Sequence, residues 1–427
     1  MSQGRRDGRS SNGHRGGRQD RGGRQDRARP DRGRQDRGDA GAREKLPELR
    51  LKVRANGRHP WFYRKMVQKP AAPIPAGSAC KVRDREGKLC GVGFYNPRAE
   101  LALRMFADKP PETTVTAHFL AALEQAIELR EQALALPQTT DAYRLIHAEG
   151  DGFPGLIVDR LNDAIVAQVS SLGMLQQLEA VGERLLEHYP GARLLLQQDK
   201  EWSEREGIEK LPRVVPAQTI VREHDLRYAV EAGTGHKTGF FADQRDNRLL
   251  VRSLARGRRV LDLCCNSGGF AMNAVRGGSK RVLAGDLDEA MVEQTHRNAR
   301  ANNLRFEAVH GDAFDMLRSA NQSAYDLMVL DPPKWVANKN EIEAGLQRYF
   351  DLNRLGFEKV ERSGIVVTCS CSGSVSEDSF VRMLRDAAVA ARRDVRILHL
   401  RSAGPDHPIA LECQETRYLK VAVLQVR

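Results

Sequence analysis

The stretch from Arg245 to the C-terminus constrains the fold most strongly, because it repeats a strand, a turn and a helix. Nearly continuous apolar runs predict strands within 258–265, 278–288, 306–312, 325–333, 364–372 and 416–426. Helical spacing predicts helices over 270–276, 289–303, 341–361 and 376–391. Buried strands that alternate with helices indicate an α/β fold with a mainly parallel sheet. Ligands of such sheets bind at the carboxyl ends of the strands.

Two smaller modules are expected before this region. Between residue 49 and about residue 115, short apolar and β-branched runs are separated by Pro and Gly, which predicts a β-rich module. A helix over 118–134 follows and ends before Pro137. Residues 141–230 contain further strand patterns and a helix over 173–188, which indicates a small α+β unit. We therefore expect domains at 47–125, 126–232 and 233–427.

Residues 1–46 form an arm of different composition, made mostly of Arg, Gly, Gln and Asp. Its few apolar residues cannot offset the entropy lost on ordering, so we expect it to be disordered. Within 1–43 there are 13 Arg and 6 Asp, an excess of seven positive charges out of the net +12 of the whole chain. Such a segment is either an RNA tether or a solubilising tail, and the sequence leaves both interpretations open.

Composition excludes several classes of protein. The net charge favours a polyanionic partner such as RNA. No apolar run approaches the roughly 18–20 residues that span a bilayer, and no secretory signal opens the chain. The seven cysteines are odd in number and partly clustered, which is unlike a disulfide framework. We therefore expect a cytoplasmic protein that uses neither a membrane nor a metal ion, with its oligomeric state left open.

The first strand of the repeat runs into a turn of small residues, Cys264-Cys-Asn-Ser-Gly-Gly269, that opens a helix. Gly268 and Gly269 would let a ligand approach the backbone closely. Asp286 ends the next strand, where a carboxylate can accept hydrogen bonds from both ribose hydroxyls of a nucleoside. The turn lacks the G-x-G-x-x-G pattern of dinucleotide sites, and Asp262 would repel a pyrophosphate. That acid suits the ammonium and sulfonium charges of S-adenosylmethionine, which we therefore predict as the cofactor.

Two more acids follow the next strands. Asp312 could accept a hydrogen bond from the adenine amine, and Asp331 closes the fourth strand beside the transferable methyl group. An Asp at one strand end is more often a helix cap or turn former, but four at successive strand ends favour a site. The residues predicted from these segments to bind the cofactor are Asp262, Leu263, Cys264, Asn266, Ser267, Gly268, Gly269, Asp286, Leu287, Asp312, Ala313 and Asp331.

The fifth strand carries two cysteines, Cys369 and Cys371, two residues apart and so on one face. A thiolate that adds to carbon 6 of cytosine turns carbon 5 into a nucleophile for a methyl group. Buried cysteines are often only small hydrophobes, but Cys371 has serines and glycine around it at the strand end. There Lys334 or backbone donors could stabilise its thiolate. Asp331 could hydrogen-bond the cytosine N3/N4 edge.

The turn Asp331-Pro-Pro-Lys334 lacks the Asn and the Tyr of the N-P-P-Y-like turns found in amino-group methylases. It therefore disfavours methylation of an exocyclic amine. Lys334 could hold an RNA phosphate or a base. Trp335 either stacks on a base or packs in the core, and the sequence does not decide between the two.

At this point the chain resembles bacterial 23S rRNA cytosine C5-methyltransferases with an N-terminal PUA domain. The resemblance covers about residues 49–427. It rests on Arg58-His-Pro-Trp61, Tyr143-Arg-Leu-Ile146, Asp151-Gly-Phe-Pro-Gly155, residues 235–245, Asp331-Pro-Pro-Lys334, Ser370-Cys-Ser-Gly373, Asp406-His-Pro408 and Tyr418-Leu-Lys420. It implies a PUA-like RNA-binding domain, a middle domain, a Rossmann-like class I methyltransferase domain and 23S rRNA as the partner.

The resemblance also implies roles for individual residues. It places Lys237, Thr238, Phe240 and Gln244 beside the cofactor and assigns the nucleophile to Cys371. Related RNA cytosine methylases carry a second cysteine after the Asp-Pro of the fourth strand for product release, and Asp331-Pro-Pro-Lys334 has none. Release would then use another base, water or Cys369. Methylation of another base position or of another RNA, and a non-catalytic RNA-binding role, are the alternatives.

Overall fold

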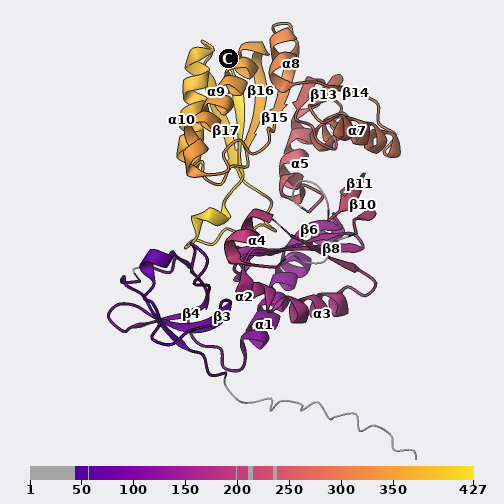
Figure 1. Cartoon of the computed structure of the whole chain (residues 1–427). Coiled ribbons are helices and arrows are strands. Elements are labelled where there is room, and N and C mark those ends of the chain that lie inside the picture. The colour runs from indigo at the N-terminus through magenta and orange to yellow at the C-terminus, as the bar shows by residue number, and fades with distance from the viewer. Residues whose placement is uncertain (1–43, 56, 199, 210–214, 234–237) are drawn as a thin grey trace, which may run out of the picture. The chain divides into compact units, whose positions relative to one another are not determined.

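The computed structural model describes residues 44–427 except 56, 199, 210–214 and 234–237 (Figure 1). Residues 1–43 of the expected disordered arm therefore lie outside the described residues. The described part of the chain contains four sheets, with five, four, two and seven strands in chain order. None of the helices in this part is long and apolar enough to cross a membrane.

The first sheet has the strand order β1-β3-β4-β5-β2 and matches the expected β-rich module. Its strands are β1 (Glu48–Arg50), β2 (Trp61–Phe62), β3 (Ser78–Arg83), β4 (Leu89–Tyr95) and β5 (Leu103–Ala107). Their pairings are antiparallel except for β1 with β3. A small apolar core that includes Leu51, Val82 and Leu103 stabilises this sheet.

The middle sheet has the order β6-β7-β8-β9 and is covered by helices. Its elements are α1 (Val115–Glu128), β6 (Ala142–His147), β7 (Leu156–Leu161), β8 (Ala164–Val169), α2 (Leu172–Leu175), α3 (Leu178–His188), β9 (Arg193–Gln197) and α4 (Lys200–Glu206). The helix expected over 118–134 begins earlier, because Thr114 caps it by accepting a hydrogen bond from Ala117 N, and it ends in a π turn over Leu129–Ala133. The helix expected over 173–188 is interrupted at 176–177.

A hairpin of β10 (Ala217–Glu223) and β11 (Leu226–Ala232) lies between the middle sheet and the last one in sequence. Asn298 of α7 (Glu289–Ala301) and Asn302, which caps the C-terminus of this helix, bind the free edge of β11. Asn298 Oδ1 accepts from Ala229 N at 3.0 Å, and Asn302 both accepts from Arg227 N and donates to its carbonyl. The hairpin is thereby fixed to the C-terminal domain. The domain boundaries predicted from the sequence stay predictions.

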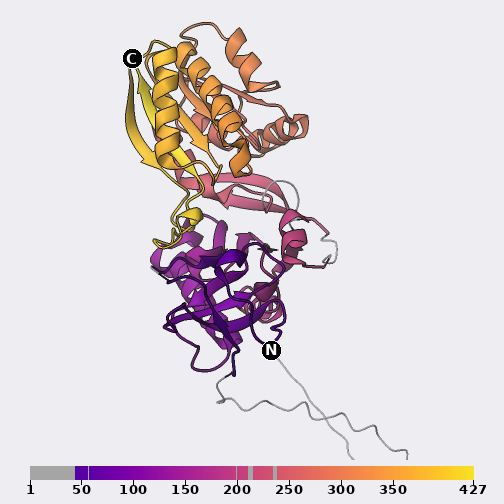
Figure 2. The same ribbon diagram turned by 60° about the vertical axis from the view of Figure 1, so that its left-hand side comes forward.

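The last sheet has the order β14-β13-β12-β15-β16-β18-β17. Its elements are α5 (Arg245–Leu254), β12 (Arg259–Leu263), α6 (Gly269–Arg276), β13 (Arg281–Asp286), β14 (Glu307–His310), α8 (Ala313–Ser319), β15 (Tyr325–Leu330), α9 (Ile342–Lys359), β16 (Val360–Ser370), α10 (Glu377–Ala390), β17 (Val395–Arg401) and β18 (Lys420–Val426). The pairings among β12 to β16 are parallel, whereas β18 is antiparallel to β16 and to β17. The last two strands, yellow in Figure 2, form one edge of the sheet. The predicted mainly parallel α/β sheet is confirmed.

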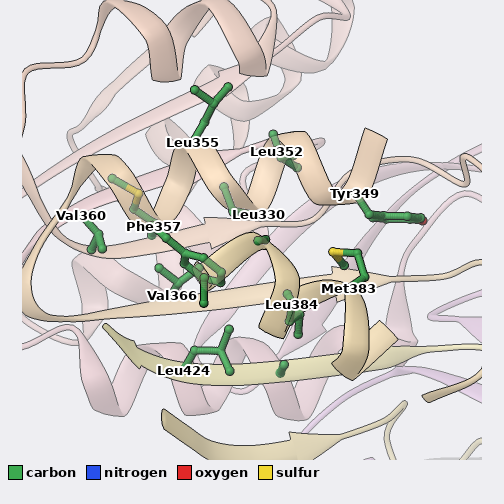
Figure 3. Packing of buried hydrophobic residues seen from close by; sticks show 14 of the residues in the cluster. Leu330, Tyr349, Leu352, Leu355, Phe357, Val360, Val366, Met383, Leu384 and Leu424 are labelled. Carbon is green, nitrogen blue, oxygen red and sulfur yellow. The ribbon is translucent and has the colours of Figure 1, made fainter. Parts of the chain in front are cut away.

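Successive residues of these strands enter two different cores. Leu261, Met328 and Val366 pack on the side of α9 and α10. Figure 3 shows Val366 there with Leu352 of α9 and Leu384 of α10. Their neighbours Val260 and Val329 pack on the other side with residues of α5 and α6. The alternation follows from the period of two in a strand. Because both faces are covered, the strands read as continuous apolar runs.

A buried set of ion pairs joins the loop after β17 to the middle sheet. Asp406 accepts from Arg245 Nη2 at 2.8 Å and from the backbone nitrogen of Arg144 at 3.0 Å. Its own carbonyl accepts from Arg130 Nη2 at 2.7 Å, and Arg130 also binds Asp151 with two parallel hydrogen bonds. Burial raises the pKa of the Asp406 carboxyl, but its interactions with His407 and Arg245 lower it further, so the pKa lies well below its ordinary value. This network ties the Asp406-His-Pro408 motif to the fold.

Candidate active site

The four acids found in the sequence lie along one edge of the last sheet. Asp262 is on β12 and Asp286 ends β13, while Asp331 directly follows β15 and Asp312 follows β14 after Gly311. These strands are neighbours and parallel, in the order β14-β13-β12-β15. Their carboxyl ends therefore meet at the same edge, where ligands of such sheets bind.

Asp262 is the most deeply buried of the four, with none of its surface exposed. Its Oδ2 accepts a hydrogen bond from Ala271 N in the first turn of α6 at 2.9 Å. Its Oδ1 has no partner among the described residues. Burial raises the pKa of this carboxyl well above its ordinary value, and the negative charges of Asp331 and Asp286 add to the effect. A cationic ligand would relieve this repulsion and supply the missing partner.

The turn after β12 is held in an unusual backbone shape. Cys264 and Asn266 have φ of +59° and +49°, and Gly268 has φ of +80°. Thr295 Oγ1 and Asn298 Nδ2 of α7 donate to the carbonyls of Asn266 and Ser267, at 2.8 and 3.0 Å. The turn is therefore fixed before any ligand binds.

The glycines of this turn are explained by packing against the protein itself. A Cβ on Gly268 would lie 2.7 Å from Cγ2 of Thr295, and one on Gly269 would lie 2.7 Å from Cδ of Arg248. That a ligand also approaches these positions stays a prediction. Leu263 is fully buried in the core on the side of α9 and α10, so only its backbone is left to face a cofactor.

Asp286 and Asp312 both shape the backbone around them. Asp286 accepts from Asn266 N at 2.8 Å and from Asp288 N at 3.0 Å. Asp312 caps α8 by accepting from Phe314 N, so the ordinary helix-cap role holds for this residue beside any cofactor role. Leu287 is 66% exposed, which leaves an apolar surface next to Asp286. Ala313 is half-buried at the start of α8.

Asp331 is held by a chain of hydrogen bonds from three other elements. Gln244, at the end of the 3-10 turn Ala242–Gln244, donates from Nε2 to Asp331 Oδ2 at 3.0 Å. Asn247 on α5 donates to Gln244 Oε1 at 2.8 Å, and Arg401 on β17 donates to Asn247 Oδ1 at 2.9 Å. Sequence reasoning placed Gln244 beside the cofactor and missed Asn247 and Arg401, because no local pattern links these positions.

The other two described residues that the resemblance placed beside the cofactor have protein partners. Thr238 is buried and its hydroxyl donates to Asp159 Oδ2 at 2.6 Å. Phe240 is buried, with its ring 5.2 Å from that of Tyr228 and the Arg248 guanidinium 5.1 Å from its centre. Lys237 lies outside the described residues.

The two cysteines of β16 and its end differ in environment. Cys369 is fully buried, and burial together with the negative charge of Asp331 raises the pKa of its thiol well above the ordinary value. Cys371 is only partly buried and packs against the same core as Cys369, as expected for residues two apart on one face. Of the two thiols, Cys371 is the one that a substrate could reach.

The fold brings a second lysine, Lys420, close to Cys371, while the role predicted for Lys334 stays a prediction. Lys334 is exposed and forms no hydrogen bond or ion pair with any residue that the structure describes. Lys420, the first residue of β18, is buried and donates from Nζ to the carbonyls of Ser372 and Tyr418. The sequence held one signal for it, since a lysine begins a strand that is apolar except for Gln425. Trp335 is partly buried with its ring 4.8 Å from that of Tyr349, which favours its core-packing interpretation.

These residues fit S-adenosylmethionine. The unpartnered oxygen of Asp262 and the surrounding acids favour a ligand with positive charge, and Asp286 with Leu287 offers a carboxylate and an apolar surface at the next strand. Both features match a nucleoside that carries ammonium and sulfonium groups.

Comparisons with known proteins agree with this site. A family model described as S-adenosylmethionine-dependent methyltransferase matches residues 191–402, and one described as PUA-like domain matches 51–108. The chain is 34% identical over 381 residues to ribosomal RNA large subunit methyltransferase I of Tolumonas auensis, which covers 86% of this chain and 95% of the relative. The chain belongs to the ribosomal RNA large subunit methyltransferase I family. The member from Escherichia coli O139:H28 is 33% identical over 85% of this chain and 94% of its own length.

Solved structures share the fold of the family. A methyltransferase crystallised with SAH superposes with a TM-score of 0.75 at 19% identity, covering 89% of this chain and all of the other. A SAM-dependent methyltransferase from Streptococcus mutans gives 0.73 at 19% identity, covering 88% of this chain and all of its own. The predicted fold class is confirmed, and so is S-adenosylmethionine as the cofactor of this family member.

Proposed function

We propose that this protein methylates carbon 5 of a cytosine in 23S ribosomal RNA, using S-adenosylmethionine and a covalent bond between Cys371 and carbon 6 of the base. The large-subunit RNA target is suggested by the names of its relatives. The observation that carries the base and the position is Cys371, a partly accessible thiol at the end of β16. It lies on the sheet edge that also holds Asp331.

The chemistry follows from what a thiolate does to a pyrimidine. The Sγ electron pair of Cys371 forms a bond to carbon 6, and the ring electrons move so that carbon 5 becomes nucleophilic. S-adenosylmethionine, when bound, supplies a methyl group on a sulfonium. Once carbon 5 carries that methyl group, it loses its proton to a base, the Sγ–C6 bond breaks and the thiolate is released. Asp331, held by Gln244, is positioned to hydrogen-bond the N3/N4 edge while the ring carries charge.

Cys369 is a poor candidate both for the attack on carbon 6 and for the removal of the carbon 5 proton. Its thiol is fully buried, so it cannot reach a base in this arrangement. Its raised pKa keeps the thiol protonated near neutral pH, so it would not accept the carbon 5 proton. We therefore assign proton removal to water or to a base of the RNA complex.

Incubation with labelled S-adenosylmethionine and unmodified 23S rRNA, followed by nucleoside analysis, tests the proposal. We expect 5-methylcytosine from the wild type, none from Cys371→Ser, and retained turnover in the control Cys369→Ala. Another methylated nucleoside, or turnover by Cys371→Ser, would overturn the proposed chemistry. Transfer to a different RNA, with 23S rRNA untouched, would leave the chemistry and replace the substrate. Absence of cofactor binding in calorimetry would favour the non-catalytic alternative.

Mapping of the modified nucleotide in rRNA from cells with and without the gene then identifies the target. A cytosine that carries the 5-methyl group only when the gene is present is the expected result.

A further inference from the structure

Lys420 is a buried ammonium next to the proposed nucleophile. Only 3% of its surface is exposed, and its backbone pairs with Ser370 across the strands β16 and β18. Its Nζ donates to the carbonyl of Ser372 at 2.5 Å and to that of Tyr418 at 2.8 Å. The lysine thus contacts the residues on both sides of Cys371, Ser370 through its backbone and Ser372 through its side chain.

The charge of Lys420 is not balanced by an acid. It forms no ion pair with any residue that the structure describes, and both of its hydrogen-bond acceptors are neutral carbonyls. Glu377 of α10 is the carboxylate that acts on it, and Glu377 is bound by Arg417. A buried ammonium without a nearby anion destabilises the fold. We therefore expect Lys420 to interact with an anion that forms close to it.

Cys371 is the group that can supply this anion. Burial lowers the pKa of Lys420 to about 8, and the negative charge of Cys371 is the largest influence that opposes burial. Coupling between two titrating groups is mutual, so an ammonium favoured by the thiolate also favours the thiolate.

The other described titratable groups near the thiol are either neutral or already paired with an opposite charge. Cys369 and the hydroxyl of Tyr349 both have pKa values raised by burial, and so both stay neutral near pH 7. Arg417 is neutralised by Glu377. Of these described groups, Lys420 is the one that brings a buried, unpaired positive charge to the thiol.

We propose that Lys420 is a positioning residue whose ammonium stabilises the thiolate of Cys371 and sets the pH at which the nucleophile forms. The thiol proton is released to solvent, and Lys420 keeps its own proton. The consequence for catalysis rests on the proposed function, whereas the effect on the thiol does not require RNA.

The full-length protein without RNA provides the first test. The rate at which iodoacetamide alkylates Cys371 is followed by mass spectrometry from pH 5 to pH 10. In Lys420→Met we expect the midpoint of the rate profile to rise by about one pH unit or more, which makes alkylation at pH 7 about tenfold slower. Lys420→Arg keeps the charge and should keep most of the wild-type rate.

Lys359 is a matched control, because its Nζ also donates to two main-chain carbonyls, those of Arg318 and Ala320. It precedes the first residue of β16, whereas Cys371 follows the last, so the two lie at opposite ends of this 11-residue strand. Lys359→Met should leave the midpoint unchanged. A wild-type midpoint in folded Lys420→Met, or a shift in Lys334→Met instead, would overturn the inference.

A second measurement covers the case in which Lys420→Met does not fold. Lysine labelled with ¹³C at Cε reports the titration of Lys420 by NMR, and Cys371→Ser removes the anion without disturbing a buried group. We expect the Lys420 pKa to fall in Cys371→Ser. An unchanged titration would contradict the coupling.

The pH profile of methylation connects the inference to turnover. The acidic limb of kcat/KM should move to higher pH in Lys420→Gln and return in Lys420→Arg, which a purely structural role would not produce. If the product is not 5-methylcytosine but the thiol midpoint still follows Lys420, the proposed function fails alone. If the product is 5-methylcytosine but the midpoint of the Cys371 alkylation profile does not change in Lys420→Met, only the inference about Lys420 is wrong.

Discussion

Gly268 offers the most direct test of how the cofactor turn is built, because two separate constraints act on it. Its φ of +80° is a left-handed conformation that costs other residues roughly 1–2 kcal/mol. A Cβ at this position would lie 2.7 Å from Cγ2 of Thr295. Additional atoms in a well-packed region typically cost about 1–3 kcal/mol more. We therefore expect Gly268→Ala to destabilise the domain by about 2–5 kcal/mol.

A comparison with Gly278 separates the cost of the left-handed backbone from the cost of the contact with Thr295. Its φ of +82° is nearly the same, but a Cβ there meets nothing within 4 Å. The difference between the two alanine variants is the packing contribution alone, about 1–3 kcal/mol. With about 2–4 °C for each kcal/mol, Gly268→Ala should unfold about 2–12 °C below Gly278→Ala in a thermal scan.

A second substitution, Thr295→Ser, should restore part of the stability that Gly268→Ala loses. It removes Cγ2 and keeps the hydroxyl that donates to the carbonyl of Asn266 at 2.8 Å. In the Gly268→Ala background it should recover a substantial part of the difference in Tm. Equal Tm values for the two glycine variants, or no recovery with Thr295→Ser, would refute the packing explanation. Calorimetry should also show weaker S-adenosylmethionine binding in Gly268→Ala but not in Gly278→Ala.

Three further predictions concern charge and positioning. The pKa of Asp262 is higher in the folded than in the unfolded protein. Ionisation of this carboxyl therefore opposes folding once the pH rises above 3.8. Asp262→Asn should thus raise the Tm of the cofactor-free protein at pH 7 and weaken cofactor binding about tenfold or more in calorimetry. Arg245→Met should destabilise by about 3–5 kcal/mol. Because folding lowers the pKa of Asp406, the wild type should be more stable than Arg245→Met at every pH above 3.8. This difference in stability should disappear as the pH falls through the pKa of Asp406 in the folded protein, and a plot of Tm against pH would show it. Asn247→Leu should slow single-turnover methylation about 2–10-fold by releasing the chain that holds Asp331, and an unchanged rate would contradict that role.

The sequence predicted the elements that carry their signal locally. The apolar runs of β12, β13, β15 and β16 and the helices after them were expected within a few residues of their observed bounds. β17 was missed because Arg396, His399 and Arg401 interrupt its apolar residues, as the exposed position of this edge strand allows, so no continuous apolar run marks it. The helix expected over 173–188 was joined across a break, because helical spacing alone does not show where two short helices meet.

The sequence by itself determined the four acids at successive strand ends and the cysteine at the fifth, because parallel neighbours bring their carboxyl ends to one edge. Which groups act on those residues was decided only by the tertiary structure. Lys420 interacts electrostatically with Cys371 because β18 runs antiparallel beside β16. Arg401 is connected to Asp331 through Asn247 and Gln244 because β17 lies on the outer side of β18. Lys420 and Cys371 are 49 positions apart and Arg401 and Asn247 are 154 apart, and these spacings follow no repeat. Only the packing of the sheet could therefore place a buried charge beside the thiol.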